Sequence, residues 1–257
     1  MMFSIAQNDD LGSQVMNAGG VPIYISTKKE IPTKIKSTLS IMEKDIPEKI
    51  TKPIKWNCNV RSSYFKTKMS LGGNETDIER MVKESEPLSE YLSVDVLAFL
   101  EYLNFDSQNF VWGFELWWSQ KYGNGEYQEI HNHLSHPLDD MKTILSVIYL
   151  PYKNDSHSLC INLQEGINLH SSYFLPVNEN NSANAFALGS PHHLNSLEDN
   201  TVIIFPSYVN HSVKWVNPSK KDRVSFSSNV VIQKKTEVID PHKKVIEPHR
   251  RTKYGWS

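Results

Sequence analysis

The spacing of apolar residues changes from a helical period to a strand period at about residue 105. Before that point, residues 20–26 predict a first strand, and apolar residues at intervals of three or four predict a helix between residues 35 and 46. A second helical stretch follows the Gly72-Gly73 turn, and Pro87 interrupts it. An apolar stripe then runs from Leu88 to Leu103, as on a helix with one buried face. We expect both helices to buttress a sheet.

Beyond residue 105, short apolar stretches alternate with polar residues, and Asn, Gly, Pro, Ser and Asp separate them. This pattern predicts a sandwich or barrel of short strands, such as a jelly roll, with flanking helices. We therefore divide the chain into an N-terminal scaffold (1–105), a β core (106–233) and a C-terminal tail (234–257). The predicted strands cover residues 110–121, 127–133, 143–150, 158–163, 183–188, 201–205, 212–216 and 223–233.

Composition and charge narrow the class of protein. Apolar residues make up 39% of the 257 residues, which is enough for a substantial core. The net charge is −2, so nothing global favours nucleic acid or anionic lipid as a partner. The chain has no apolar stretch of membrane-spanning length, no start typical of a secretory signal, and two distant cysteines. We expect a cytoplasmic protein that acts on a small molecule or a peptide, and an oligomer is compatible with this pattern.

Two histidines stand two residues apart at the end of a predicted strand. Side chains at this spacing share one face of a strand, so His131 and His133 can present two imidazoles to one metal ion. Imidazole is a ligand for Fe, Zn, Ni or Cu. Ten histidines in the chain make such a pair common by chance, so the pair needs a second signal.

The second signal lies about eighty residues later. A buried apolar strand, 201–205, ends in a Pro-Ser turn and is followed by His211. Twelve residues further on, Arg223 and Ser225 begin another alternating strand. An arginine on a barrel strand costs desolvation unless an anion pairs with it, and a guanidinium beside a hydroxyl suits a carboxylate. The order of these elements predicts a metal and an anchored dicarboxylate in one barrel mouth.

These motifs resemble the 2-oxoglutarate/Fe(II)-dependent oxygenases of the prolyl-hydroxylase branch. The similarity lies in KYGNGEYQEIHNH (121–133), the strand TILSVIYL (143–150), and the combination FPS…H…RVSFSSN that bacterial and phage members share. It covers about residues 110–233. It implies a double-stranded β-helix core, Fe(II) as the metal, and a hydroxylase that converts 2-oxoglutarate and O₂ to succinate and CO₂.

Residue roles follow from this resemblance position by position. His131 and His211 match the iron ligands of the family. Arg223, with Ser225 and Tyr149, matches the anchor for the distal carboxylate of 2-oxoglutarate. Two further tyrosines complete the implied pocket: Tyr122, which adds a hydroxyl, and Tyr127, which lies near the metal.

The chain departs from the family at the third ligand. His133 stands where the family has Asp or Glu, which leaves the site one unit more positive. A three-His iron site is our first interpretation. In a second, Asp139 or Asp140 folds back to complete a two-His-one-carboxylate triad. In a third, the oxygenase chemistry is lost.

Two other functions stay open at this stage. A cupin-type three-His dioxygenase without 2-oxoglutarate accounts for His133 but gives Arg223 and Tyr149 no role. A catalytically inactive jelly roll that serves as a binding or structural module is the other alternative, and it predicts no stoichiometric iron and no release of succinate.

Overall fold

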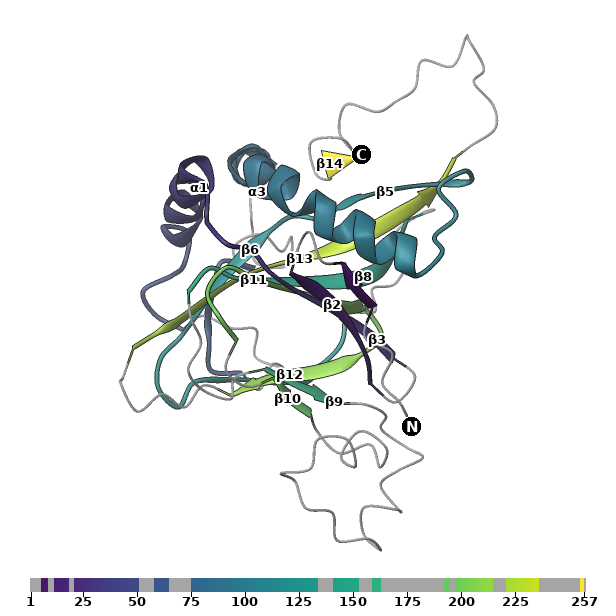
Figure 1. The fold of residues 1–257 in the computed structure, drawn as a ribbon. Helices are drawn as coiled ribbons and strands as arrows, with labels where there is room; N and C mark the ends of the chain where they lie inside the picture. The colour runs from purple at the N-terminus through teal and green to yellow at the C-terminus, as the bar shows by residue number, and fades with distance from the viewer. Residues whose placement is uncertain are drawn as a thin grey trace, which may run out of the picture.

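Two antiparallel sheets face each other, and the helices α1 (Thr33–Glu43) and α3 (Glu75–Tyr102) cover the outer face of the larger sheet (Figure 1). This computed structural model describes residues 6–8, 12–18, 21–50, 58–64, 75–133, 141–152, 159–162, 192–194, 197–214, 221–235 and 255–256. The larger sheet contains β1 (Ala6–Asn8), β2 (Ser13–Ala18), β3 (Val21–Thr27), β4 (Arg61–Ser62), β5 (Phe110–Phe114), β6 (Trp118–Tyr122), β8 (Met141–Leu150), β11 (Thr201–Pro206), β13 (Arg223–Lys234) and β14 (Gly255–Trp256). The smaller contains β7 (Tyr127–His131), β9 (Leu159–Asn162), β10 (His192–Leu194) and β12 (Asn210–Lys214).

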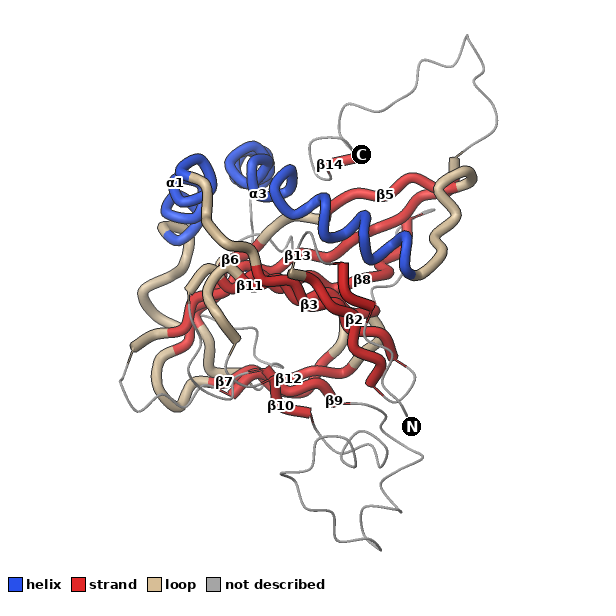
Figure 2. Tube along the Cα trace, viewed as in Figure 1, coloured by secondary structure: helices blue, strands red, loops and turns tan. Residues whose placement is uncertain are grey.

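The strand order agrees with a double-stranded β-helix. The larger sheet runs β1-β2-β3-β11-β8-β13-β5-β14, with β6 also on β13, and the smaller runs β10-β9-β12-β7. Figure 2 shows the two sheets lying opposite each other, with loops that connect them at the sides. The prediction of a mainly β fold with this core and flanking helices is confirmed. The predicted strand 110–121 is two strands, β5 and β6, and the predicted strand 183–188 lies outside the described residues.

Both faces of the larger sheet are buried, so neighbouring residues on one strand enter different cores. On β8, Ile148 belongs to the core between the two sheets, whereas Tyr149 belongs to the core beneath the helices. On β11, Ile203 and Ile204 divide in the same way. Strands buried on both faces have continuous apolar sequences, as in TVIIFP of β11. The direction of a side chain on these strands therefore decides whether it can reach the space between the sheets.

Helix α3 continues through Pro87, so the prediction that this proline interrupts the helix is wrong. A proline inside a helix costs about 3 kcal/mol through a lost hydrogen bond and a clash. Fully burying an apolar side chain contributes about 1.5–3 kcal/mol, and four from this helix are fully buried against the sheet. These residues are Leu88, Leu92, Val96 and Phe99, and their burial outweighs the local penalty of the proline.

Neither helix in the described part of the chain combines the length and apolarity needed to cross a bilayer.

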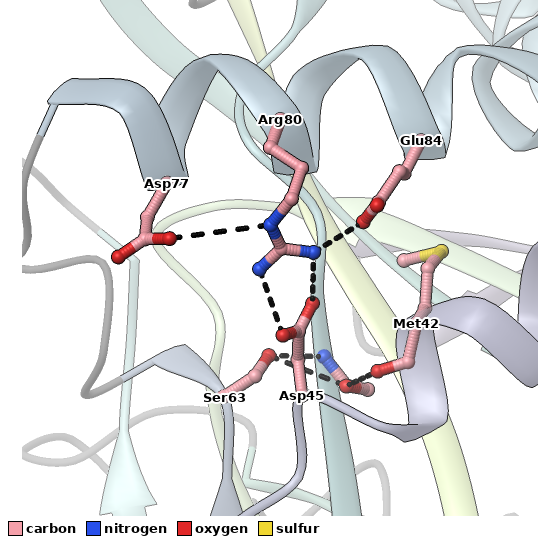
Figure 3. A network of polar contacts seen from close by, with 7 residues as sticks. Met42, Asp45, Ser63, Asp77, Arg80 and Glu84 are labelled. Atoms are coloured by element: carbon pink, nitrogen blue, oxygen red, sulfur yellow. Dashed lines mark hydrogen bonds and ion pairs between the residues drawn. The ribbon is translucent and has the colours of Figure 1, made fainter.

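Polar contacts tie the two helices to the strand β6 (Figure 3). Arg80 of α3 donates to both carboxylate oxygens of Asp45, just after α1, at 2.9 and 3.3 Å, and also pairs with Glu84. Ser119 of β6 donates its hydroxyl to the Met42 carbonyl oxygen at 2.8 Å. Ser119 lies between Trp118 and Gln120, whose side chains face the space between the sheets. The contact with Met42 therefore lets the helices help to hold this part of β6 in place.

Candidate metal centre

The structure brings His131, His133 and His211 together. His131 ends β7 and pairs directly with His211 of β12. The backbone N–H of His133 donates to the Ser207 carbonyl oxygen at 2.9 Å, which holds this residue beside the turn that precedes β12. One ring nitrogen from each histidine lies within 4.8 Å of the other two. Such a group of nitrogen atoms can hold one metal ion.

A β-bulge in β7 aims the first histidine. His211 pairs with His131 and Val213 pairs with Gln128, so two residues of β7 oppose Ser212 alone. The extra residue reverses the alternation of side chains between the two faces of the strand. Gln128 and His131, three residues apart, therefore line the same pocket.

Hydrogen bonds at Nδ1 fix two of the rings. His131 Nδ1 lies 2.8 Å from the Glu129 carbonyl oxygen, and His211 Nδ1 lies 3.0 Å from the Val209 carbonyl oxygen. Because a carbonyl oxygen can only accept, each Nδ1 carries the proton and each Nε2 keeps its lone pair. This is the usual arrangement for histidines that bind metal through Nε2.

His133 has polar partners of its own. Its Nδ1 lies 2.6 Å from Asn229 Oδ1 and 2.9 Å from Ser146 Oγ, while the Trp118 ring packs beside the imidazole with the centroids 5.8 Å apart. Packing on one side and hydrogen bonding on the other hold the ring in one orientation.

Burial keeps all three imidazoles neutral. It lowers the pKa of His131 and lowers that of His133 to about 4, with the neighbouring His131 adding to the second shift. Burial also lowers the pKa of His211 well below its ordinary value, and the other two histidines add to this effect. Neutral rings have a free lone pair, which is the form that binds a metal cation.

Arg223, the first residue of β13, lies in the same pocket with only 4% of its surface exposed. Its Nη1 donates to Ser225 Oγ at 3.3 Å, and its guanidinium carbon lies 5.1 Å from the centroid of the Tyr122 ring. Its Nε and Nη2 are buried and have no hydrogen-bond partner within the described structure. Burial lowers the pKa of Arg223, but a guanidinium stays cationic near neutral pH. A buried cation with two free donors is costly unless an anion binds to it.

The pocket lies between the sheets and encloses about 310 Å³, its open mouth included. Among the residues described, three histidines form one part of its wall, and an arginine, two serines and two glutamines form another. The remaining lining side chains are apolar. The lining residues are Trp118, Gln120, Gln128, His131, His133, Ile148, His211, Val213, Arg223, Ser225 and Ser227. The histidines and the arginine therefore face one shared space.

Tyr149 is not in this pocket, which corrects the expectation that it holds the co-substrate. Its hydroxyl donates to Asn200 Oδ1 at 2.8 Å beneath the helices, and the preceding residue, Ile148, lines the pocket instead. The alternation of β8 places Tyr149 on the other face of the larger sheet.

Tyr127 and Tyr122 also have surroundings other than the expected ones. Along β7, Tyr127 and His131 lie on either side of the bulge, and Tyr127 directly precedes the pocket residue Gln128. The backbone of Tyr127 pairs with Asn59. Tyr122 is fully buried, and its hydroxyl, whose pKa burial raises, donates to Gln128 Oε1 at 2.9 Å. Its ring supports the guanidinium of Arg223, so it acts on the arginine rather than adding a hydroxyl to the pocket. Asp139 and Asp140 lie outside the described residues.

Gln128 is a pocket residue that sequence reasoning missed. Its Oε1 accepts from Gln120 Nε2 at 3.1 Å as well as from Tyr122, so its Nε2 is turned toward His131 Nε2, 3.3 Å away. Strand alternation places Gln128 and His131 on opposite faces, so only the bulge reveals this neighbour. Gln120 had a signal in the sequence, because it shares a strand face with Tyr122 at a spacing of two.

Comparisons with known proteins find similar solved structures but no matching family model. No family model matches the chain, and no curated protein matches it. Similar solved structures include a prolyl-4-hydroxylase from Pseudomonas putida, with 13% identity, a TM-score of 0.45, and coverage of 83% of this chain and 93% of that one. The viral collagen prolyl hydroxylase of Paramecium Bursaria Chlorella virus-1, in a complex with 2-oxoglutarate, has 10% identity, a TM-score of 0.40, and coverage of 88% and 99%.

A third similar structure contains a metal as well. HygX from Streptomyces hygroscopicus, with nickel and 2-oxoglutarate bound, has 10% identity, a TM-score of 0.41, and coverage of 86% of this chain and 83% of that one. At these identities, the role of each residue follows only from the geometry of this chain.

Proposed function

We propose that this protein is an Fe(II)- and 2-oxoglutarate-dependent dioxygenase, an oxidoreductase that hydroxylates a small molecule or a peptide. One observation carries the proposal: three histidines whose neutral form burial favours face the same pocket as a buried arginine, two of whose donors have no partner among the described residues. The histidines suit a cation and the arginine suits an anion. A ligand that joins the two must carry a metal-binding group at one end and a carboxylate at the other, as 2-oxoglutarate does.

The donor set fits a catalytic metal. His131, His133 and His211 would hold Fe(II) through Nε2 and leave coordination positions for small ligands. Imidazoles alone also suit zinc, nickel and copper, so the arginine is what favours the iron and 2-oxoglutarate pair over a simple metal site.

The remaining pocket residues bind and orient the co-substrate. Arg223 would donate Nε and Nη2 to the distal carboxylate, with Ser225 beside it. When bound, Fe(II) and 2-oxoglutarate supply the oxidising chemistry by which O₂ hydroxylates a C–H bond, with release of succinate and CO₂. The apolar walls formed by Trp118, Ile148 and Val213 exclude water from this space.

The other two functions leave features of this chain without a role. A three-His dioxygenase without 2-oxoglutarate does not use the buried, unpaired donors of Arg223. A binding or structural module needs neither these donors nor two histidines whose Nδ1 bonds aim Nε2 into the pocket. The 2-oxoglutarate oxygenase accounts for both features.

Anaerobic titration tests the metal and the co-substrate together. Fe(II) followed by 2-oxoglutarate is expected to produce a visible metal-to-ligand charge-transfer band that neither component produces alone. Admission of O₂ is expected to release succinate. Stoichiometric iron binding without the band would favour the three-His dioxygenase, and absence of iron binding would favour the structural module.

A further inference from the structure

His133 occupies the position that holds a carboxylate in related metal sites, and a carboxylate reaches it indirectly. Its Nδ1 lies 2.6 Å from Asn229 Oδ1, and Asn229 Nδ2 donates to Glu115 Oε2 at 2.7 Å. Glu115 follows β5, Asn229 lies on β13, and His133 follows β7. Three distant segments of the chain thus form one line of hydrogen bonds that ends at a metal ligand.

Glu115 fixes the direction of this line. An ionised carboxylate can only accept, so the amide nitrogen of Asn229 must face Glu115 and its oxygen must face His133. The oxygen in turn requires a proton on His133 Nδ1, which leaves the Nε2 lone pair free for the metal. Without Glu115, nothing in the described surroundings requires Asn229 to keep this orientation.

The backbone holds the two outer members in place. The Glu115 N–H donates to the Asn229 carbonyl oxygen at 2.8 Å, and the Ser228 hydroxyl donates to the Glu115 carbonyl oxygen at 2.6 Å. Both contacts join Glu115, which lies between β5 and β6, to β13, the strand with which β5 and β6 both pair. The side chain of Glu115 therefore starts from a fixed backbone position.

We propose that Glu115 and Asn229 are positioning residues that give His133 the character of a charged ligand. The Glu115 carboxylate takes the place of a carboxylate on the metal itself, but it is separated from the metal by the side chains of Asn229 and His133. Its negative charge polarises the Asn229 amide and, through it, the His133 imidazole. A hydrogen-bonded imidazole with negative charge behind it is a stronger donor to a cation, which offsets the missing ligand charge. This inference rests on the metal centre proposed above.

A charge-relocation experiment tests this role, with anaerobic Co(II) as the probe and its visible absorption as the readout. The Glu115→Gln variant is expected to bind Co(II) about 10- to 100-fold more weakly, the scale of losing an outer partner of a metal ligand. Adding Asn229→Asp to Glu115→Gln returns a carboxylate to the line, one side chain nearer to His133. This double variant is expected to recover most of the lost affinity.

Matched controls separate the relay from folding and from the metal centre itself. Glu90→Gln removes an exposed carboxylate of α3 that is paired with Lys34, and it is expected to leave Co(II) affinity unchanged. Wild-type affinity in Glu115→Gln, or no recovery in the double variant, would overturn the relay and leave the metal centre intact. Failure of the wild-type chain to bind Co(II) would overturn the metal centre and the relay together. Thermal unfolding of each variant confirms that folded protein is compared.

Discussion

Replacing Arg223 with methionine is expected to weaken 2-oxoglutarate binding by about 100-fold and to stabilise the metal-free protein. Removing one partner of a buried charge pair costs about 2–5 kcal/mol of binding, and 2.8 kcal/mol corresponds to about 100-fold. Without its anion, however, the guanidinium is a buried cation with two donors that no residue in the described part of the chain accepts from. An apolar side chain of similar length removes that cost, so we expect a gain of about 1 kcal/mol or more, or about 2–4 °C in Tm.

The two effects have opposite signs, which makes the experiment selective. Isothermal titration of the Fe(II)-loaded protein measures the co-substrate affinity, and thermal unfolding of the metal-free protein measures the stability. Arg80→Met is the matched control, because Arg80 is ion-paired on α3 and is expected to show neither effect. Arg223→Lys keeps the charge but not the paired donors and should retain only part of the affinity. Normal 2-oxoglutarate affinity in Arg223→Met would remove the basis for choosing this co-substrate.

Replacing His211 with alanine is expected to weaken metal binding about 100- to 1,000-fold. A four-ligand zinc site binds with about 10–16 kcal/mol, so one ligand contributes roughly 2.5–4 kcal/mol. His211 is 2% exposed, and its ligand nitrogen lies within 4.8 Å of the ligand nitrogens of His131 and His133, so the substitution removes one of three buried metal-binding groups. Metal-induced stabilisation gives a second readout, because a ligand that binds only the folded protein raises Tm. The wild-type Tm should rise with Fe(II), and the variant Tm should not.

Lys214→Ala provides the control on the same strand. Lys214 lies three residues after His211, is exposed, and does not line the pocket in the described structure. It should bind metal as the wild-type protein does. If His211→Ala kept the wild-type affinity, the three-histidine centre would be wrong, and the pocket arginine would need another explanation.

The sequence determined the fold class and the chemical classes of the site. The strand patterns after residue 105 alternate where one face of a sheet is buried and are continuously apolar where both faces are buried, and each pattern can be read from a short stretch of sequence. The spacing of His131 and His133, and the order of His211 and Arg223 along the chain, are likewise visible in the sequence. The structure brings these four residues to one pocket.

Only the tertiary structure decided which further side chains reach the pocket. One extra residue in β7 turns Gln128 inward beside His131 and leaves Tyr127 outside, and nothing in the alternating pattern marks that residue. Because both faces of the larger sheet are buried, the apolar sequence of β8 does not show which face each side chain occupies. The structure shows that Ile148 lines the pocket and that Tyr149 packs in the core beneath the helices.

The line from Glu115 through Asn229 to His133 depends on three segments of the chain, after β5, on β13 and after β7, that only folding brings together. Sequence patterns record the period of each segment, whereas pairing register and bulges are set by long-range packing. The candidate ligands were therefore visible in the sequence, and the side chains that hydrogen-bond to them were not.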